Sequence, residues 1–195
     1  MALNAGADTI EHMVFHSDEM LEKLVAAGTP VCPTLLHRTD HAIAVRTETG
    51  TPKFTLDKMR KIQPFCFETF QAMHKAGVKI FMGTDMGPEL DMGSNALELE
   101  VYVDLGMTPM EAIQTTTKNA AEAVRLDKEI GTLDVGKKSD MLLINGNPAE
   151  DIKVLQPREN IKVVMKDGKV FVDRRKGQKK RVINVDYKSW ALADG

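Results

Sequence analysis

Short apolar runs alternate with helical stretches in the first part of the sequence, and this order limits the folds open to the chain. The runs at 7–12, 29–36 and 78–82 are predicted strands, and amphipathic helices are predicted at 17–28 and 56–76. Strands that alternate with helices are typical of parallel βα units. We therefore predict an α/β fold built on a parallel sheet.

Local signals predict where several of these helices begin and end. Ser17 is placed to cap the first helix, and Gly28 and Gly77 are placed to end the first and the long helix. Pro64 predicts a break or a kink in the long helix. The sequence Thr108-Pro109-Met110-Glu111 is a capping box with proline at the first helical position, and it predicts a helix to about residue 116.

The remaining stretches of this half are predicted as one irregular segment and two helices. Residues 37–52 are polar and are predicted to be irregular, whereas 95–105 and 117–126 are predicted helices. The pattern changes at Gly131. A strand at 141–145 and a predicted hairpin around Asp167-Gly168 indicate a small all-β unit.

Composition excludes several classes of function. The chain has 195 residues and a net charge of −2, which gives no case for binding nucleic acid or a membrane surface. No apolar run approaches the roughly 20 residues that span a bilayer. The sequence shows no secretory signal pattern, and Cys32 and Cys66 fit reduced thiols. We expect a cytoplasmic protein without a nucleic-acid or membrane partner.

Six basic residues lie between Arg174 and Arg181. We interpret them as part of a solvated tail, in preference to a phosphate or nucleic-acid patch. The sequence also contains no GxSxG elbow and no GxxxxGK[ST] phosphate loop, so neither a serine hydrolase nor a P-loop nucleotide site is indicated.

Two side chains of the kind that bind metals directly follow predicted strands. Asp85 lies past 78–82, in GTDMG, and His12 ends the first strand. Barrel enzymes carry their catalytic residues at this end of their strands, and imidazole and carboxylate are zinc ligands. Alternatively, Asp85 caps the next helix or bonds the loop backbone, and His12 is a hydrogen-bonded strand-end histidine. A catalytic zinc also needs a third protein ligand.

The glycines beside Asp85, Gly83 and Gly87, are expected to let the backbone turn and to leave space beside the carboxylate. The other four histidines lack a comparable placement; they are His16, His37, His41 and His74. The i, i+4 spacing of His37 and His41 would suit a helical two-histidine site, but the glutamate of an HExxH motif is missing. We therefore predict no metal role for this pair.

Five stretches of the sequence together carry a family resemblance that extends to about Asp173. In order they are GADTIEH, GVKIFMGTDMG, LGMTPMEAIQTTTKNAAEAVRL, IGTLDVGKKSDMLLINGNPAEDI and VMKDGKVFV. They resemble the C-terminal part of the amidohydrolase superfamily, in the branch of imidazolonepropionase and Xaa-Pro dipeptidase-like enzymes. The order of the stretches makes the resemblance specific.

The resemblance implies a (β/α)8 TIM barrel that holds one or two divalent metals, usually zinc, and a smaller β-sandwich. Residues 1–124 would then be barrel strands 6 to 8 with their helices, 125–173 part of the sandwich, and 174–195 the basic tail. His12 matches a metal ligand on strand 6, and Asp85 matches the strand 8 aspartate.

The implied activity is metal-dependent hydrolysis of C–N bonds in cyclic amides or dipeptides. The resemblance gives Asp85 two tasks, to bind the metal and to carry a proton from the bridging water to the leaving nitrogen. Iron and manganese accept the same ligand pair as zinc. The sequence does not identify the substrate.

Several parts of the family pattern have no counterpart in the chain. The HxH pair of strand 1, the lysine or glutamate of strand 4 and the histidine of strand 5 are all missing, and Met92-Gly93 stands where relatives often have His-Gly. Three parallel strands alone would leave open sheet edges. We therefore expect a fragment, whether a truncated product, a partial gene call or half of a split enzyme. An N-terminal half or a second copy would cover the open sheet.

Two other functions stay open at this point. One is a non-catalytic remnant domain that folds or associates without a metal centre. The other is a binding module that acts through its basic tail.

Overall fold

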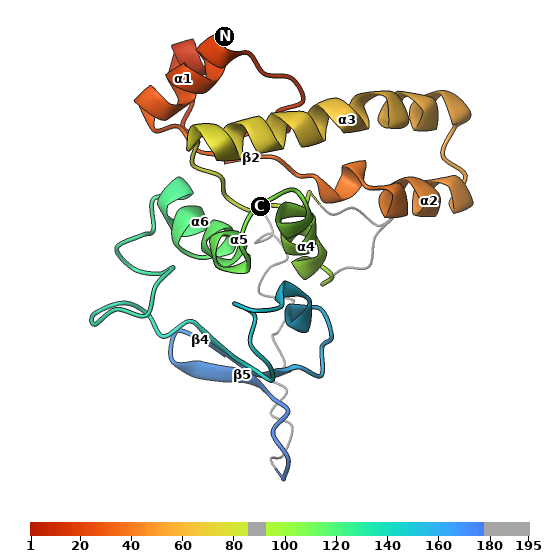
Figure 1. Cartoon of the computed structure of the whole chain (residues 1–195). Helices are drawn as coiled ribbons and strands as arrows, with labels where there is room; N and C mark the ends of the chain where they lie inside the picture. Colours follow the sequence, from red (N-terminus) through yellow and green to blue (C-terminus); the bar gives the residue numbers. More distant parts are fainter. Residues whose placement is uncertain (86–92, 178–195) are drawn as a thin grey trace, which may run out of the picture.

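The computed structural model describes residues 1–85 and 93–177 (Figure 1). The helices and strands of the first half are η1 (Leu3–Ala5), β1 (Ile10–Glu11), α1 (Asp18–Ala27), β2 (Val31–Cys32), η2 (Leu36–Arg38), α2 (Asp40–Glu48), α3 (Lys53–Ala76), α4 (Ala96–Asp104), α5 (Pro109–Thr116) and α6 (Lys118–Ala123). Those of the second half are β3 (Met141–Ile144), η3 (Ile152–Leu155), β4 (Ile161–Lys166) and β5 (Lys169–Asp173).

The predicted parallel sheet is present, with shorter strands than the sequence suggested. β1 and β2 pair in parallel, with Ile10 opposite Val31. The predicted strand at 78–82 lies on the other side of β2, where it forms a single parallel bridge between Val31 and Ile80. Val31 N donates to Lys79 O at 2.9 Å, and Phe81 N donates to Val31 O at 3.0 Å. Three chain segments therefore run in the same direction and end at one edge.

The predicted helix ends are confirmed. The Ser17 side chain accepts a hydrogen bond from Met20 N at the start of α1, and Gly28 ends that helix with φ 65°. Gly77 ends α3 with φ 77°. Thr108 and Glu111 form both halves of the capping box that begins α5.

Two expectations about the helices are wrong. The stretch predicted to be irregular contains α2, which the Thr39 side chain caps. α2 is held by tertiary packing, because its Ile43 joins Leu56 and Met59 of α3 in a small apolar cluster. Pro64 lies inside α3, a helix of 24 residues from Lys53 to Ala76, so of its two predicted effects the break is wrong.

The main core lies where the helices cover the parallel segments. Val31, Leu35, Phe70, Met73 and Tyr102 are fully buried in it. The rings of Phe70 from α3 and Tyr102 from α4 stack with their centroids 4.8 Å apart. Packing across these elements fixes the ends of β1 and β2 relative to the segment at 80.

The second half forms an antiparallel sheet in the order β3-β4-β5 (Figure 1, lower part). The predicted hairpin is confirmed: Asp167 and Gly168, with φ 50° and 71°, connect β4 to β5. A short 3-10 helix, η3, was not foreseen, and its Ile152 is buried in the main core of the first half. This contact joins the two halves.

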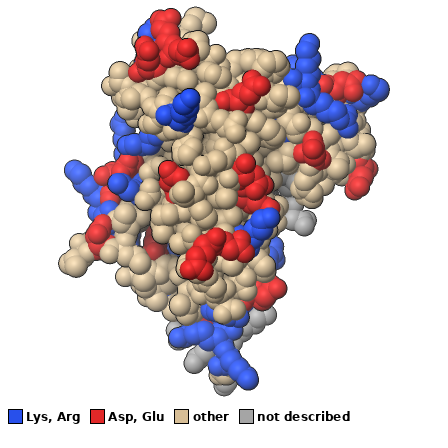
Figure 2. Space-filling view, viewed as in Figure 1, with Lys and Arg blue, Asp and Glu red and all other residues tan. Residues whose placement is uncertain are grey.

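Charged side chains of both signs are interspersed over the face shown in Figure 2. Within residues 1–85 and 93–177, none of the helices is both long and apolar enough to cross a bilayer. Three of the six basic residues between Arg174 and Arg181, together with Gly87 and Met92, lie outside the described residues.

Candidate functional site

Three left-handed residues lie at the ends of the three parallel segments. His12 directly follows β1, Thr34 comes two residues after β2, and Asp85 follows the segment at 80. Their φ angles are 56°, 51° and 47°, and they are three of the five non-glycine residues with positive φ in the described chain. This conformation is costly, especially for β-branched threonine, and such strain concentrates at functional sites.

The structure brings the two residues predicted from the sequence together. His12 Nε2 lies 3.9 Å from Asp85 Oδ2, and these side chains are 48% and 69% exposed. The other ring nitrogen, His12 Nδ1, lies 2.6 Å from Thr34 Oγ1. The backbone N–H of His12 donates to Cys32 O at 3.0 Å and so extends the pairing of β1 and β2 to the site.

A cavity of about 140 Å³ opens between these strand ends, and all of its lining residues are polar; they are His12, Thr34, His37, Arg38, Arg46 and Asp85. His37 lies in η2, and its Nε2 is hydrogen-bonded to the backbone carbonyl of Asp85. His41 lies in α2 and does not line this cavity, so the two histidines do not form a helical pair. His37 lines the cavity and contacts the backbone of Asp85, which the HExxH pattern did not predict. The signal available was its position directly after the predicted strand at 29–36.

The approach of Cys32 to Gly83 positions the segment that leads to Asp85. The Cys32 thiol donates to Gly83 O at 3.7 Å, and a Cβ added at residue 83 would lie only 2.7 Å from Sγ. Gly83 therefore allows the close approach of Cys32, whereas it was expected to let the backbone turn and to leave space beside the Asp85 carboxylate. Burial, aided by the Glu98 carboxylate, raises the pKa of Cys32 to about 12, so this thiol stays neutral.

A buried carboxylate holds the loop on the other side of the site. Glu98 of α4 is fully buried, and its two oxygens accept hydrogen bonds from the backbone N–H groups of Leu35 and Leu36, both at 2.7 Å. Burial raises the pKa of Glu98 to about 7, against the lowering effect of these two bonds. Glu98 thereby anchors the backbone between Thr34 and His37. Nothing in its sequence context, ALELEV, distinguished it from an exposed helix residue.

Two of the three remaining histidines make side-chain contacts. His16 Nδ1 lies 2.9 Å from Thr69 Oγ1, and His74 Nε2 lies 3.4 Å from Glu111 Oε1. His41 is exposed on α2.

A divalent metal fits the donor atoms of His12 and Asp85. Zinc binds imidazole nitrogen and carboxylate oxygen at about 2.0–2.2 Å, so two atoms on one tetrahedral ion lie about 3.4 Å apart. The observed 3.9 Å exceeds this by about 0.5 Å, a gap that a small rotation of the exposed Asp85 side chain closes. The described residues contain no cluster of three or more His, Cys, Asp or Glu side chains suited to an ion. Among the described residues, His12 and Asp85 therefore supply two donor side chains, one fewer than the three protein ligands of a catalytic zinc.

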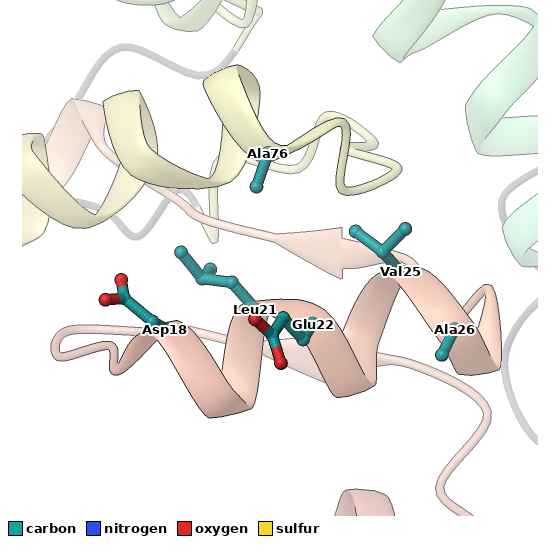
Figure 3. Close-up of a pocket in the computed structure, with 6 residues that line it drawn as sticks. All are labelled: Asp18, Leu21, Glu22, Val25, Ala26 and Ala76. Atoms are coloured by element: carbon teal, nitrogen blue, oxygen red, sulfur yellow. The ribbon is translucent and has the colours of Figure 1, made fainter.

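A larger hollow of about 470 Å³ lies between α1 and the end of α3 (Figure 3). Leu21 of α1 points toward Ala76 of α3, and Val25 and Ala26 extend the apolar wall. This hollow has no imidazole or thiol in its lining. The chemistry of the described chain is concentrated at the strand ends.

Comparison with known proteins agrees with this geometry. Residues 1–171 match the family model described as Amidohydrolase family. The chain belongs to the amidohydrolase family. The resemblance noted in the sequence is thereby confirmed, and so is the α/β fold.

The chain is 33% identical over 172 residues to the ochratoxinase of Aspergillus niger, covering 87% of this chain and 35% of that protein. It is 30% identical over 180 residues to the imidazolonepropionase of Alkaliphilus metalliredigens (strain QYMF), covering 89% and 37%. The crystal structure of a Xaa-Pro dipeptidase with bound methionine superimposes with a TM-score of 0.77 at 34% identity, covering 87% and 41%. The chain therefore spans well under half the length of these relatives.

Proposed function

We propose that the chain contributes His12 and Asp85 to the divalent-metal site of a hydrolase that cleaves C–N bonds. The observation that carries this proposal is the 3.9 Å approach of His12 Nε2 to Asp85 Oδ2 at the ends of neighbouring parallel segments. Membership of the amidohydrolase family and the names of the relatives support the reaction class.

In the proposed reaction, Asp85 and His37 have different roles. His12 and Asp85 would hold a divalent ion, to which zinc is well suited by its preference for nitrogen and oxygen donors, and that ion would supply polarisation of the scissile carbonyl and acidification of water. Asp85 is exposed to the cavity and can accept the proton that the attacking water loses, then donate it to the leaving nitrogen. His37 holds the backbone carbonyl of Asp85 and so steadies the carboxylate in this task.

The proposal assigns the rest of the site to other strands. Residues 1–124 form part of a (β/α)8 barrel, 125–173 form part of a β-sandwich, and the further metal ligands come from strands that precede β1 in the barrel. The half-exposed apolar residues of β3, Met141, Leu142 and Leu143, support this assignment, because they suit a sheet that packs against another segment. An N-terminal half or a second copy would provide that cover.

The cavity also suggests a substrate class. Arg38 and Arg46 line it beside Asp85. Guanidinium groups bind carboxylates in a planar, two-bond geometry. A substrate with an amide C–N bond near a free carboxylate, such as a dipeptide, therefore suits the site, and cyclic amides are the other candidates.

A second function has one observation in its favour. Because the described residues offer a pair of ligands and not three, a non-catalytic domain that acts by association with another chain is the alternative. It predicts no metal binding and no loss of stability in Asp85→Asn.

A chimera tests the proposed function. The chain replaces the matching segment of the Aspergillus niger ochratoxinase, and hydrolysis of a panel of dipeptides and N-acyl amino acids is measured with and without a chelator. We expect metal-dependent hydrolysis that Asp85→Asn reduces at least about 100-fold, as for a lost proton-transfer group, with an unchanged melting temperature of the chelator-treated protein. The imidazolonepropionase scaffold provides a second chimera. A folded, metal-loaded chimera without hydrolysis would contradict the proposal.

A further inference from the structure

We infer that Thr34 is a positioning residue that fixes the tautomer of His12, so that Nδ1 carries the proton and the lone pair of Nε2 faces Asp85. The value of this arrangement for metal binding rests on the proposed function. The tautomer itself does not, because it is a property of the metal-free chain.

The inference rests on the hydrogen bonds of the Thr34 hydroxyl. Thr34 Oγ1 has a single hydrogen and two close polar neighbours, Pro33 O at 2.8 Å and His12 Nδ1 at 2.6 Å. A carbonyl oxygen accepts and never donates, so the hydroxyl hydrogen goes to Pro33 O. His12 Nδ1 must then donate its own hydrogen to Oγ1. A neutral imidazole carries one N–H, which leaves Nε2 as the acceptor.

Burial and the neighbouring hydrogen bonds hold the Thr34 hydroxyl in a fixed position. The residue is only 3% exposed and adopts φ 51°, which is unfavourable for a β-branched side chain. The next two backbone N–H groups, of Leu35 and Leu36, are tied to the buried Glu98 carboxylate. The strained backbone therefore cannot easily relax and move Oγ1 away from His12.

The choice of tautomer matters because His12 Nε2 faces Asp85 and the cavity. His12 Nε2 lies 3.9 Å from Asp85 Oδ2 and lines the cavity. Only the unprotonated nitrogen of a histidine can bind a metal, and a hydrogen bond at the other nitrogen selects which one it is. Thr34 therefore presents a ligand nitrogen to the cavity before any ion arrives.

The chain contains an independent copy of the same arrangement. Thr69 Oγ1 donates to Val14 O at 2.9 Å and lies 2.9 Å from His16 Nδ1. By the same reasoning His16 is also protonated at Nδ1. Because His16 does not line the cavity, this pair provides a matched control for the tautomer without any connection to the metal.

Long-range ¹H–¹⁵N NMR correlations of the histidine rings test the inference in the full 195-residue chain. The chain is freed of metal with a chelator and measured near pH 8, where histidine side chains are ordinarily neutral. The His12 signals, assigned with a His12→Ala variant, are expected to show protonated Nδ1 and unprotonated Nε2. Protonated Nε2 in the unmodified chain overturns the inference, whatever the variants do.

Substitutions at the two threonines separate positioning from packing. Thr34→Val keeps the β-branched shape and removes the hydroxyl, and it is expected to shift His12 toward the Nε2–H form without affecting His16. Thr34→Ser is expected to restore the Nδ1–H form, and Thr69→Val is expected to change only His16. A His12 tautomer that is the same in Thr34→Val as in the unmodified chain overturns the inference.

Zinc titration of the same proteins distinguishes this inference from the proposed function. Thr34→Val is expected to weaken zinc binding about 10- to 100-fold, the usual cost of losing a partner of a metal-bound histidine, and Thr34→Ser is expected to recover most of it. A chain that shows the Nδ1–H tautomer and binds zinc equally well with and without His12→Ala would contradict the proposed function and leave the role of Thr34 intact. Zinc affinity that is equal in both Thr34 variants would contradict the consequence for the metal.

Discussion

Apolar residues are buried to very different extents in the βα half and in the three-stranded antiparallel sheet. Around β2, residues such as Val31, Leu35 and Phe70 are completely buried. In β3, the consecutive residues Met141, Leu142 and Leu143 are 38%, 55% and 51% exposed, so both faces of that strand are open. The first half has a core of its own within this chain, whereas β3 has an apolar sequence without matching burial.

This difference shows which half holds the site in place. His12, Thr34 and Asp85 emerge from the buried segments, and their strained backbones need a rigid surrounding to persist. The antiparallel sheet contributes no residue to the cavity lining. Its contact with the first half runs through η3, where Ile152 enters the main core and Lys153 pairs with Glu100 of α4.

Truncation of a core ring should produce the largest effect. Phe70→Ala removes a fully buried side chain that stacks on Tyr102, and we expect a loss of about 3–5 kcal/mol in the free energy of unfolding. Leu142→Ala, in the half-exposed strand, should change it by no more than about 0.5 kcal/mol. Urea unfolding of both variants makes the comparison. Equal losses would show that β3 is buried in solution.

The second largest loss of stability is expected at the contact between the two halves. Ile152→Ala empties a site that is 3% exposed within the core of the first half, and a loss of about 2–4 kcal/mol is expected. The control is Leu133→Ala, at a position that is 75% exposed. If hydrogen exchange showed that Ile152→Ala loosens only η3 and the antiparallel sheet, the halves would be independent units.

The buried carboxylate predicts a pH dependence whose sign follows from its raised pKa. Folded Glu98 keeps its proton up to about pH 7, whereas the unfolded chain loses it near 4.5, so its stabilising contribution is complete below pH 4.5. Stability is then lost as the pH rises through about 7, by up to about 3 kcal/mol. Unfolding curves from pH 4.5 to 8 should show this decline, and Glu98→Gln should flatten it.

Glu100, two residues further along α4, supplies a control of opposite sign. Its bond to Lys153, and then that to Gln156, lower the pKa of Glu100. Its contribution is therefore present above the unfolded pKa and is lost as the pH falls. Glu100→Gln should leave the decline between pH 4.5 and 7 in place. If it abolished that decline instead, Glu98 would not be its source.

The smallest effect is expected at the ion pair between the halves. Lys153 Nζ lies 2.7 Å from Glu100 Oε1, with side chains 59% and 24% exposed. Such a pair contributes about 0–1 kcal/mol, and less at high salt. Lys153→Ala measured in low and in 1 M salt should therefore show a small difference that salt removes. A larger loss than that of Ile152→Ala would mean that charge, and not burial, couples the halves.

The features that the sequence predicted correctly are local. Ser17, Gly77 and the Thr108–Glu111 capping box act within one helical turn, so their roles can be read from a few neighbouring letters. The pairing of His12 with Asp85 followed from a general rule, that parallel strands end at one edge, together with the family resemblance.

The features that the sequence did not predict depend on contacts between distant segments. α2 forms because Ile43 packs on α3, which a polar composition does not indicate. Thr34 and Glu98 are set by their environment: one adopts a conformation that threonine rarely takes, and the other buries a carboxylate on backbone amides 62 and 63 residues away. No local pattern marks either residue.

Zinc binding to the 195-residue chain, measured by isothermal titration calorimetry, tests the central claim that His12 and Asp85 act together on a metal. The variants are His12→Ala and Asp85→Asn, with His16→Ala as the control outside the cavity. The account predicts that each of the first two weakens zinc binding at least about 10-fold and that the third does not. Measurable zinc binding of the same affinity in all four proteins would contradict it.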